Sequence, residues 1–152
     1  MRRCESSDEI ALREVYEDAI RTCDKSLYSQ EQIESWSALA YLPGILDKPL
    51  KQGVGWVSCV DKPIEAFALK YPHNRLALLY CRGRSSRQGH ATDLLHQIEE
   101  DTFKDRPITL KTEASLCSYQ LLLRHGWTII TPEEIKIGGV NFSRYLMEKT
   151  LH

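Results

Sequence analysis

The chain has 152 residues, of which 42% are hydrophobic and 27% charged, so it is long enough for one domain with a sizeable core and too short for two. Its 20 Lys and Arg against 21 Asp and Glu give a net charge of -1, which offers no support for nucleic acid or an anionic membrane as a partner. The apolar runs fall short of the roughly 20 residues that a membrane-spanning helix needs, and the N-terminal residues lack the apolar segment of a secretion signal. We therefore expect one soluble, cytoplasmic domain over residues 1–152.

The N-terminal part predicts two helices. Apolar residues follow helical spacing from about residue 8 to residue 22, with Ser7 or Asp8 as the cap. Ser29, with Gln32 three positions later, predicts a capping box at the start of a second, short helix.

Three strand-like runs come next, at Val54–Val60, Ile64–Tyr71 and Leu76–Cys81, and the linkers between them are short enough for hairpins. These runs predict an antiparallel meander. A helix to about Thr102 and a strand over Ile108–Thr112 follow, and this strand should return beside Leu76–Cys81. The middle of the chain therefore predicts one strand, helix, strand crossover.

The C-terminal part predicts a helix and a hairpin. Ser115 can cap a helix through Arg124 that Gly126 would end. We expect a short strand over residues 127–131, then another strand-like segment at 135–137 that the turn Gly138-Gly139 joins to a last strand over 140–148. The whole order predicts an α+β fold, with a mixed, mostly antiparallel sheet flanked by helices and one βαβ crossover.

The segment from Ser85 to Ala91 lies between a strand-like run and a helical repeat. A turn that carries Arg and Gly and opens directly into a helix presents unpaired backbone N–H groups, the positive end of the helix dipole and cationic side chains at one point. This junction suits a phosphate or pyrophosphate. Exposed strand-to-helix loops are commonly polar and glycine-containing, so the segment alone does not decide between a ligand site and a plain loop.

The five cysteines and five histidines do not predict a metal site. The cysteines are odd in number, widely spread and without C-x-x-C spacing, which favours reduced thiols over disulfides or zinc. His90 and His96 lie six positions apart on one expected helix and so face different directions. We assign Cys81 and Cys117 to packing, because neither has an adjacent His or a catalytic motif.

The order of elements and the motifs of this chain resemble the GNAT superfamily of N-acetyltransferases. The signature of that family reads Gln/Arg-x-x-Gly-x-Gly/Ala, and residues 86–91 read Ser-Arg-Gln-Gly-His-Ala, with Ser86 in the place of the first residue. The Gly126-Trp127 pair and the closing segment 145–149 also resemble the family. The blocks 16–20 and 28–32, together with Trp36, resemble a subgroup of small bacterial members.

This resemblance implies acetyl-coenzyme A as cosubstrate, with no metal. Its pyrophosphate would lie on backbone N–H groups of the signature turn, and its pantetheine between the diverging strands Leu76–Cys81 and Ile108–Thr112. Main-chain groups of the first strand would also polarise the thioester carbonyl. The implied cofactor-binding residues are Leu79, Tyr80, Cys81, Arg84, Arg87, Gln88, Gly89, His90, Ala91 and Thr92.

Direct attack of an amine on a thioester needs a deprotonated amine and a proton for the leaving thiolate. The strand Leu76–Cys81 contains no Asp or Glu, which leaves Glu65, Glu113 or solvent as the base, and we take Glu65 as the first candidate. The family often has a Tyr where this chain has Leu122, so Tyr119, one helical turn earlier, becomes the candidate acid.

Tyr28 and Trp36 are the candidates for contact with the acceptor, because acceptor pockets form in this region of similar proteins. The competing interpretation makes Trp36 and Tyr16 helix-face core residues, and Trp56 a core residue of the sheet.

The resemblance implies an acyltransferase that moves acetyl from acetyl-coenzyme A to a primary amine of a small molecule or peptide. The alternative keeps the fold without the reaction, as an acyl-coenzyme-A-binding sensor or partner protein, since Ser86 and Leu122 depart from the family pattern. The sequence leaves open a homodimer, the identity of the acceptor and the length of the acyl group.

Overall fold

The computed structural model describes residues 1–59, 61, 63–104 and 108–152. Its α-helices are α1 (Glu9–Arg21), α2 (Gln30–Ser37), α3 (Asp47–Gln52), α4 (His90–Phe103) and α5 (Tyr119–Arg124). Its strands are β1 (Arg2–Arg3), β2 (Val54–Cys59), β3 (Ile64–Lys70), β4 (Leu76–Cys81), β5 (Thr109–Ala114), β6 (Thr128–Ile137) and β7 (Val140–Thr150).

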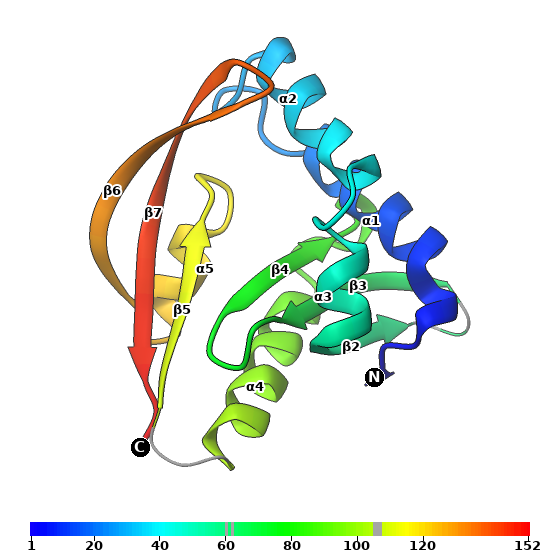
Figure 1. Ribbon diagram of the computed structural model, residues 1–152, viewed down its shortest axis with the longest axis vertical. Coiled ribbons are helices and arrows are strands. Elements are labelled where there is room, and N and C mark those ends of the chain that lie inside the picture. Colours follow the sequence, from blue (N-terminus) through cyan, green and yellow to red (C-terminus); the bar gives the residue numbers. More distant parts are fainter. Residues whose placement is uncertain (60, 62, 105–107) are drawn as a thin grey trace.

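The strands form two sheets that meet at one point. One sheet has the order β1-β2-β3-β4 and the other the order β5-β7-β6, each with antiparallel neighbours. Strands β4 and β5 touch near their starts, through a parallel bridge between Arg75 and Lys111 and a hydrogen bond of 2.7 Å from Thr112 Oγ1 to the carbonyl of Leu76. Beyond this contact the two strands diverge (Figure 1).

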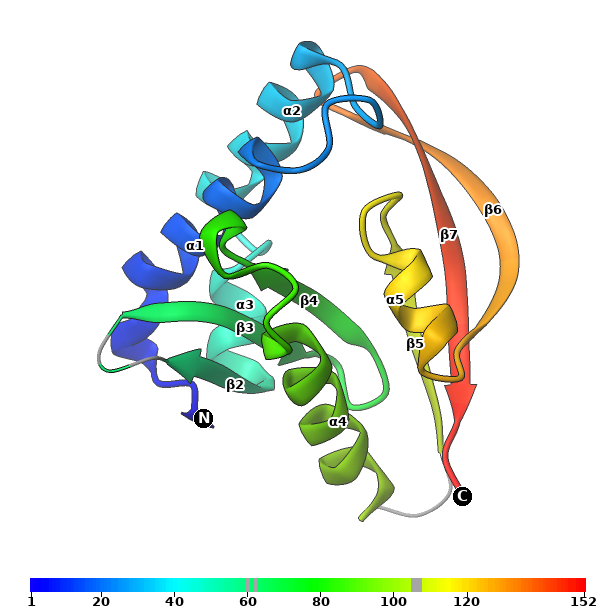
Figure 2. The same cartoon turned by 180° about the vertical axis from the view of Figure 1, so that it is seen from behind.

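Each face of the first sheet covers a separate apolar core. Strand β3 alternates between them, since Phe67 and Leu69 pack in a cluster with α1 and α2, whereas Ala66 and Ala68 pack in a cluster with α4. Figure 2 shows α4 lying across the near face of the first sheet and α5 beside β5. The second cluster continues into the other sheet through Leu110, Ala114 and Met147, and so joins the two halves of the molecule. It also contains Trp127, which is 2% exposed.

The structure confirms the predicted fold class and most of its elements. The α+β order, the antiparallel meander and the crossover through α4 are all present. The capping box is also confirmed, because the Ser29 hydroxyl accepts from the Gln32 N–H at 3.1 Å and the Gln32 side chain accepts from the Ser29 N–H at 2.9 Å. Val60, in the predicted first run of the meander, lies outside the described residues.

Three details of the prediction were wrong. Ser115 does not cap α5: the helix begins only at Tyr119, and Ser118 is the residue that precedes it. The segments 127–131 and 135–137 belong to one strand, β6, which starts after Trp127. Helix α3 and the short strand β1 were not predicted, because six- and two-residue elements carry little periodic signal.

Candidate active site

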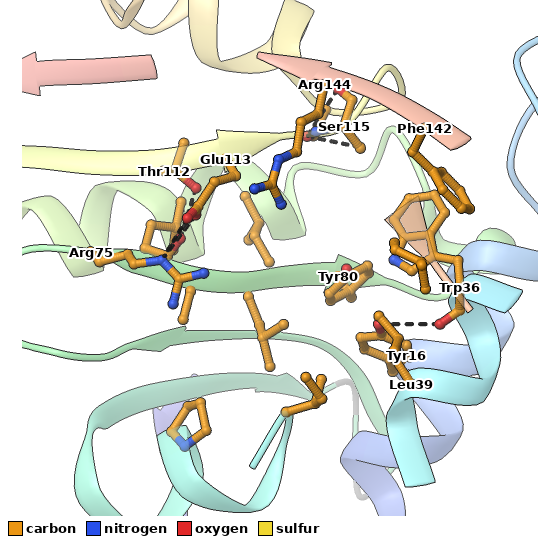
Figure 3. Close-up of a pocket in the computed structure, with 18 of the residues that line it drawn as sticks. Tyr16, Trp36, Leu39, Arg75, Tyr80, Thr112, Glu113, Ser115, Phe142 and Arg144 are labelled. Carbon is orange, nitrogen blue, oxygen red and sulfur yellow. Dashed lines mark hydrogen bonds and ion pairs between the residues drawn. The ribbon is translucent and has the colours of Figure 1, made fainter. Parts of the chain in front are cut away.

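A cavity of about 450 Å³ opens where β4 and β5 diverge (Figure 3). Residues 76–80 of β4 form one wall, and Thr112, Glu113 and Ser115 form part of the other. Helices α1, α2, α3 and α5, the β6–β7 hairpin and several loops supply the remaining lining. In the described part of the chain β4 has a strand neighbour only on its β3 side, so its other edge faces this opening. The divergence therefore leaves main-chain groups of β4 available to a ligand.

Aromatic side chains line one end of the cavity. The ring of Trp36 lies 5.1 Å from that of Tyr28, 6.3 Å from that of Phe142 and 6.4 Å from that of Tyr80. The Tyr28 hydroxyl accepts a hydrogen bond of 2.8 Å from the Leu116 N–H, and burial raises the pKa of this phenol to about 12. Tyr28 and Trp36, the two sequence candidates for acceptor contact, thus both lie on the cavity wall.

The carboxylate of Glu113 reaches the cavity from β5. Arg75 holds it, with Nε at 2.9 Å from Oε2 and 3.2 Å from Oε1. Figure 3 shows this pair beside the point where β4 and β5 touch. Glu113 was one of the bases that the sequence left open, and it is the described carboxylate on the cavity wall.

The structure argues against Glu65 as the general base. Its side chain is absent from the cavity lining and is engaged by the turn that follows β4. Its carboxylate accepts from Arg84 Nε at 2.9 Å and Nη2 at 2.6 Å, and also from the Ser85 hydroxyl. These bonds, first that of Arg84 and then that of Ser85, lower the pKa of Glu65 to about 2. Because this carboxylate lies away from the cavity, it does not meet a substrate there, and Glu65 instead holds the 83–85 turn through Arg84 and Ser85.

The turn before α4 is exposed and contains two residues with left-handed backbone. Arg87 and Gly89 both have positive φ, at 63° and 88°. A Cβ at Gly89 would meet no atom within 4 Å, so backbone conformation rather than crowding favours glycine here. Residues 86–89 are exposed, and the first N–H groups of α4 have no acceptor within the helix. His90, the first residue of α4, has its ring Nδ1 2.6 Å from the Ser58 hydroxyl.

Tyr119 lies beside the cavity rather than on its wall. It is the first residue of α5, its ring is 4.8 Å from that of Tyr145, and its hydroxyl accepts from Gln120 Nε2 at 3.3 Å. Leu122, one turn later, does line the cavity.

The two cysteines assigned to packing differ. Cys81 is partly buried against the second core cluster, and burial raises its pKa to about 11, which makes its thiol a poor nucleophile. Cys117 is exposed, so its assignment to packing was wrong, because the turn that carries it lies at the surface. Of the three other core predictions, Tyr16 is 1% exposed, and Trp36 is half-buried on the cavity wall. Trp56 is half-buried against the second core cluster and donates from Nε1 to Asp101 at 2.7 Å.

The cavity residues that sequence reasoning missed include Arg75, Phe142 and Arg144. The last two sit two positions apart on β7, so strand alternation puts them on one face, and this signal was available in the sequence. Arg75 lies in a turn, where no periodicity could mark it.

Within residues 1–59, 61, 63–104 and 108–152, no group of three or more His, Cys, Asp or Glu side chains is placed to hold a metal ion. Over the same residues, no helix combines the length and the apolar character needed to cross a membrane.

Comparison with solved structures identifies the fold. No family model and no curated protein matches the chain. A GCN5-related N-acetyltransferase from Rhodopseudomonas palustris is similar with a TM-score of 0.93 at 18% identity, over 99% of this chain and 94% of the other. The PaiA N-acetyltransferase from Thermoplasma acidophilum, in complex with coenzyme A, has a TM-score of 0.74 at 18% identity, over 99% of each chain. A ribosomal-protein-alanine N-acetyltransferase from Brucella melitensis has a TM-score of 0.68 at 17% identity, over 99% of this chain and 98% of the other. The chain therefore has the fold of the GNAT N-acetyltransferases, as its motifs predicted.

Proposed function

We propose that this protein transfers an acetyl group from acetyl-coenzyme A to a primary amine by direct attack. The observation that carries the proposal is the cavity at the divergence of β4 and β5, which joins an open strand edge, a carboxylate and an aromatic wall. The structural neighbours that are N-acetyltransferases, one of them in complex with coenzyme A, support this reaction.

In this proposal the turn before α4 holds the diphosphate of the cosubstrate. Residues 87–92 offer backbone N–H groups at the positive end of a 14-residue helix, and Arg87 adds a cation. Arg84 is engaged by Glu65 and contributes less than the sequence suggested. The free edge of β4 around Leu79–Cys81 would pair with the pantetheine and polarise the thioester carbonyl.

We assign the base to Glu113. An ammonium group beside this carboxylate can lose its proton to it, and the resulting amine attacks the thioester carbonyl so that a C–N bond forms and the C–S bond breaks. Arg75 fixes the orientation of the carboxylate through the two contacts of its Nε.

The leaving thiolate needs a proton, and we assign its donor to Tyr119. This residue starts α5, one turn before the apolar Leu122 on the cavity wall. Tyr119→Phe should lower kcat for acetyl transfer by about 10- to 100-fold without weakening coenzyme A binding, and Tyr28→Phe is its matched control. A larger loss of kcat in Tyr28→Phe would instead assign the proton donor to Tyr28, whose hydroxyl contacts the Leu116 N–H.

The binding site is tested by Gly89→Glu. The substitution strains a left-handed position and adds negative charge at the diphosphate site, so we expect at least a tenfold weaker affinity for coenzyme A in calorimetry. Gly139→Glu, also at a positive φ in open space but in the β6–β7 turn, is the control. Equal affinity in all three proteins would count against the assigned turn.

The reaction is tested by Glu113→Gln. Loss of the base should reduce kcat by about 100- to 10,000-fold while coenzyme A still binds. Thiol release from acetyl-coenzyme A with an amine panel measures this. Coenzyme binding by the wild type with no turnover of any amine would favour the sensor interpretation instead.

A further inference from the structure

The charged side chains of the cavity indicate which kind of amine it accepts. Among the described residues on its wall, Lys48, Arg75 and Arg144 are cationic and Glu113 is the carboxylate. An acceptor with several positive charges would meet this excess of cations unfavourably, whereas one that carries its own negative charge would neutralise it.

Arg144 and Glu113 project from the same face of the second sheet. Glu113 pairs with Leu146 on β7, and Arg144 lies two residues from Leu146, so strand alternation puts both side chains on one side. Figure 3 shows the guanidinium of Arg144 directed from β7 toward β4, into the cavity in which Glu113 meets Arg75. A guanidinium group and a carboxylate thus face the same cavity.

Arg144 retains donors for a ligand. Its Nε donates to Glu133 Oε1 at 2.6 Å, and its Nη2 also contacts that oxygen. No described residue is bonded to Nη1. Arg144 and Glu133 are each 30% exposed, so the pair is hydrated and can loosen when a second carboxylate approaches.

Beside polar groups such as the hydroxyls of Ser115, Ser118 and Ser143, the wall has an apolar part. It is formed by Trp36, Leu39, Ile45, Ile135, Ile137 and Phe142. This apolar part of the cavity accommodates a branched or aromatic hydrocarbon side chain better than a sugar or a polyamine.

We propose, on the basis of the function proposed above, that the acceptor is a free amino acid with an apolar side chain, whose carboxylate pairs with Arg144 while its ammonium faces Glu113. The distinguishing group is the carboxylate, because a plain amine with the same hydrocarbon body would leave Arg144 without a ligand.

The test compares L-leucine, L-leucinamide and isopentylamine as acceptors, which share one hydrocarbon body. The wild type should have a kcat/KM at least tenfold higher for leucine than for either analogue, with rates compared per concentration of free amine because the three amines differ in pKa. Equal or better acetylation of isopentylamine or leucinamide would overturn the proposal and leave the acetyltransferase function intact.

Arg144→Gln should raise KM for leucine by roughly 10- to 100-fold, the usual effect of a lost charge-assisted bond, and leave KM for isopentylamine unchanged. Glu133→Gln is the matched control, since it breaks the same ion pair but keeps the guanidinium, and it should lower KM for leucine or leave it unchanged. An equal rise of KM in both variants would show that the pair is only structural and would overturn the proposal.

The proposed function and the acceptor assignment can be refuted separately. Absence of coenzyme A binding to the wild type in calorimetry would defeat the proposed function itself. Coenzyme A binding with transfer to none of the three acceptors would defeat the acceptor assignment.

Discussion

Strands β3 and β6 show how differently the two halves of the molecule are built. All seven residues of β3 are buried, with a strand on each side and a core on each face. Strand β6 is an edge strand with one neighbour, and its first five residues are exposed. The first half thus provides most of the packing, whereas the second supplies Glu113, Phe142 and Arg144 to the cavity. The cavity therefore lies between the tightly packed first sheet and the more exposed second sheet, whose side chains have fewer packing constraints.

The contrast in packing predicts the largest difference in stability. Phe67→Ala in β3 should lower the free energy of unfolding by about 3–5 kcal/mol, because it removes a ring that is fully buried. Ile130→Ser in β6 should change it by less than about 0.5 kcal/mol, because that side chain is 55% exposed. Urea denaturation of both variants measures the difference, and similar losses would refute it.

The hydrogen bond that joins the two sheets predicts an intermediate loss of stability when it is removed. Thr112→Val keeps the shape of the side chain but removes the bond to the Leu76 carbonyl, leaving a buried acceptor without its partner. We expect a loss of about 1–3 kcal/mol in urea denaturation. Thr109→Val, whose hydroxyl contacts Thr150 in an exposed position, is the control and should be nearly neutral. If both variants unfold like the wild type, the Thr112 bond does not join the sheets.

The ion pair of Glu65 predicts a smaller effect that depends on pH. Its pKa falls from 4.5 to about 2 in the folded state, so it contributes stability above pH 4.5 that is lost as the pH falls toward 2. Thermal unfolding midpoints between pH 6 and about 2 should therefore decline less steeply for Glu65→Gln than for the wild type. Identical slopes would show that the carboxylate is not bound in the folded protein.

Local sequence signals predicted the first half well. Ser29 and Gln32 specify their capping box through neighbouring residues, and the meander follows from short linkers and apolar runs. Such local signals could not predict the first residue of α5, because Ser115 and Ser118 lie three positions apart and both suit a helix cap.

Other features depend on contacts between distant segments. The continuity of β6 through Pro132 is possible because an edge strand tolerates a residue without an N–H group. The role of Glu65 follows from its meeting with Arg84, nineteen positions away, which only the folded chain reveals. The split between the sheets likewise depends on packing rather than on any local motif.

Gln32 connects two regions of the molecule. Besides closing the capping box of α2, its Nε2 donates to the carbonyl of Asn141 at 2.9 Å, at the tip of the β6–β7 hairpin. Glutamate would serve the cap equally well but has no N–H to give to that carbonyl. An exchange that looks neutral for the helix would therefore remove a bond to the hairpin that carries Phe142 and Arg144, so the choice of capping residue on α2 bears on the shape of the distant cavity.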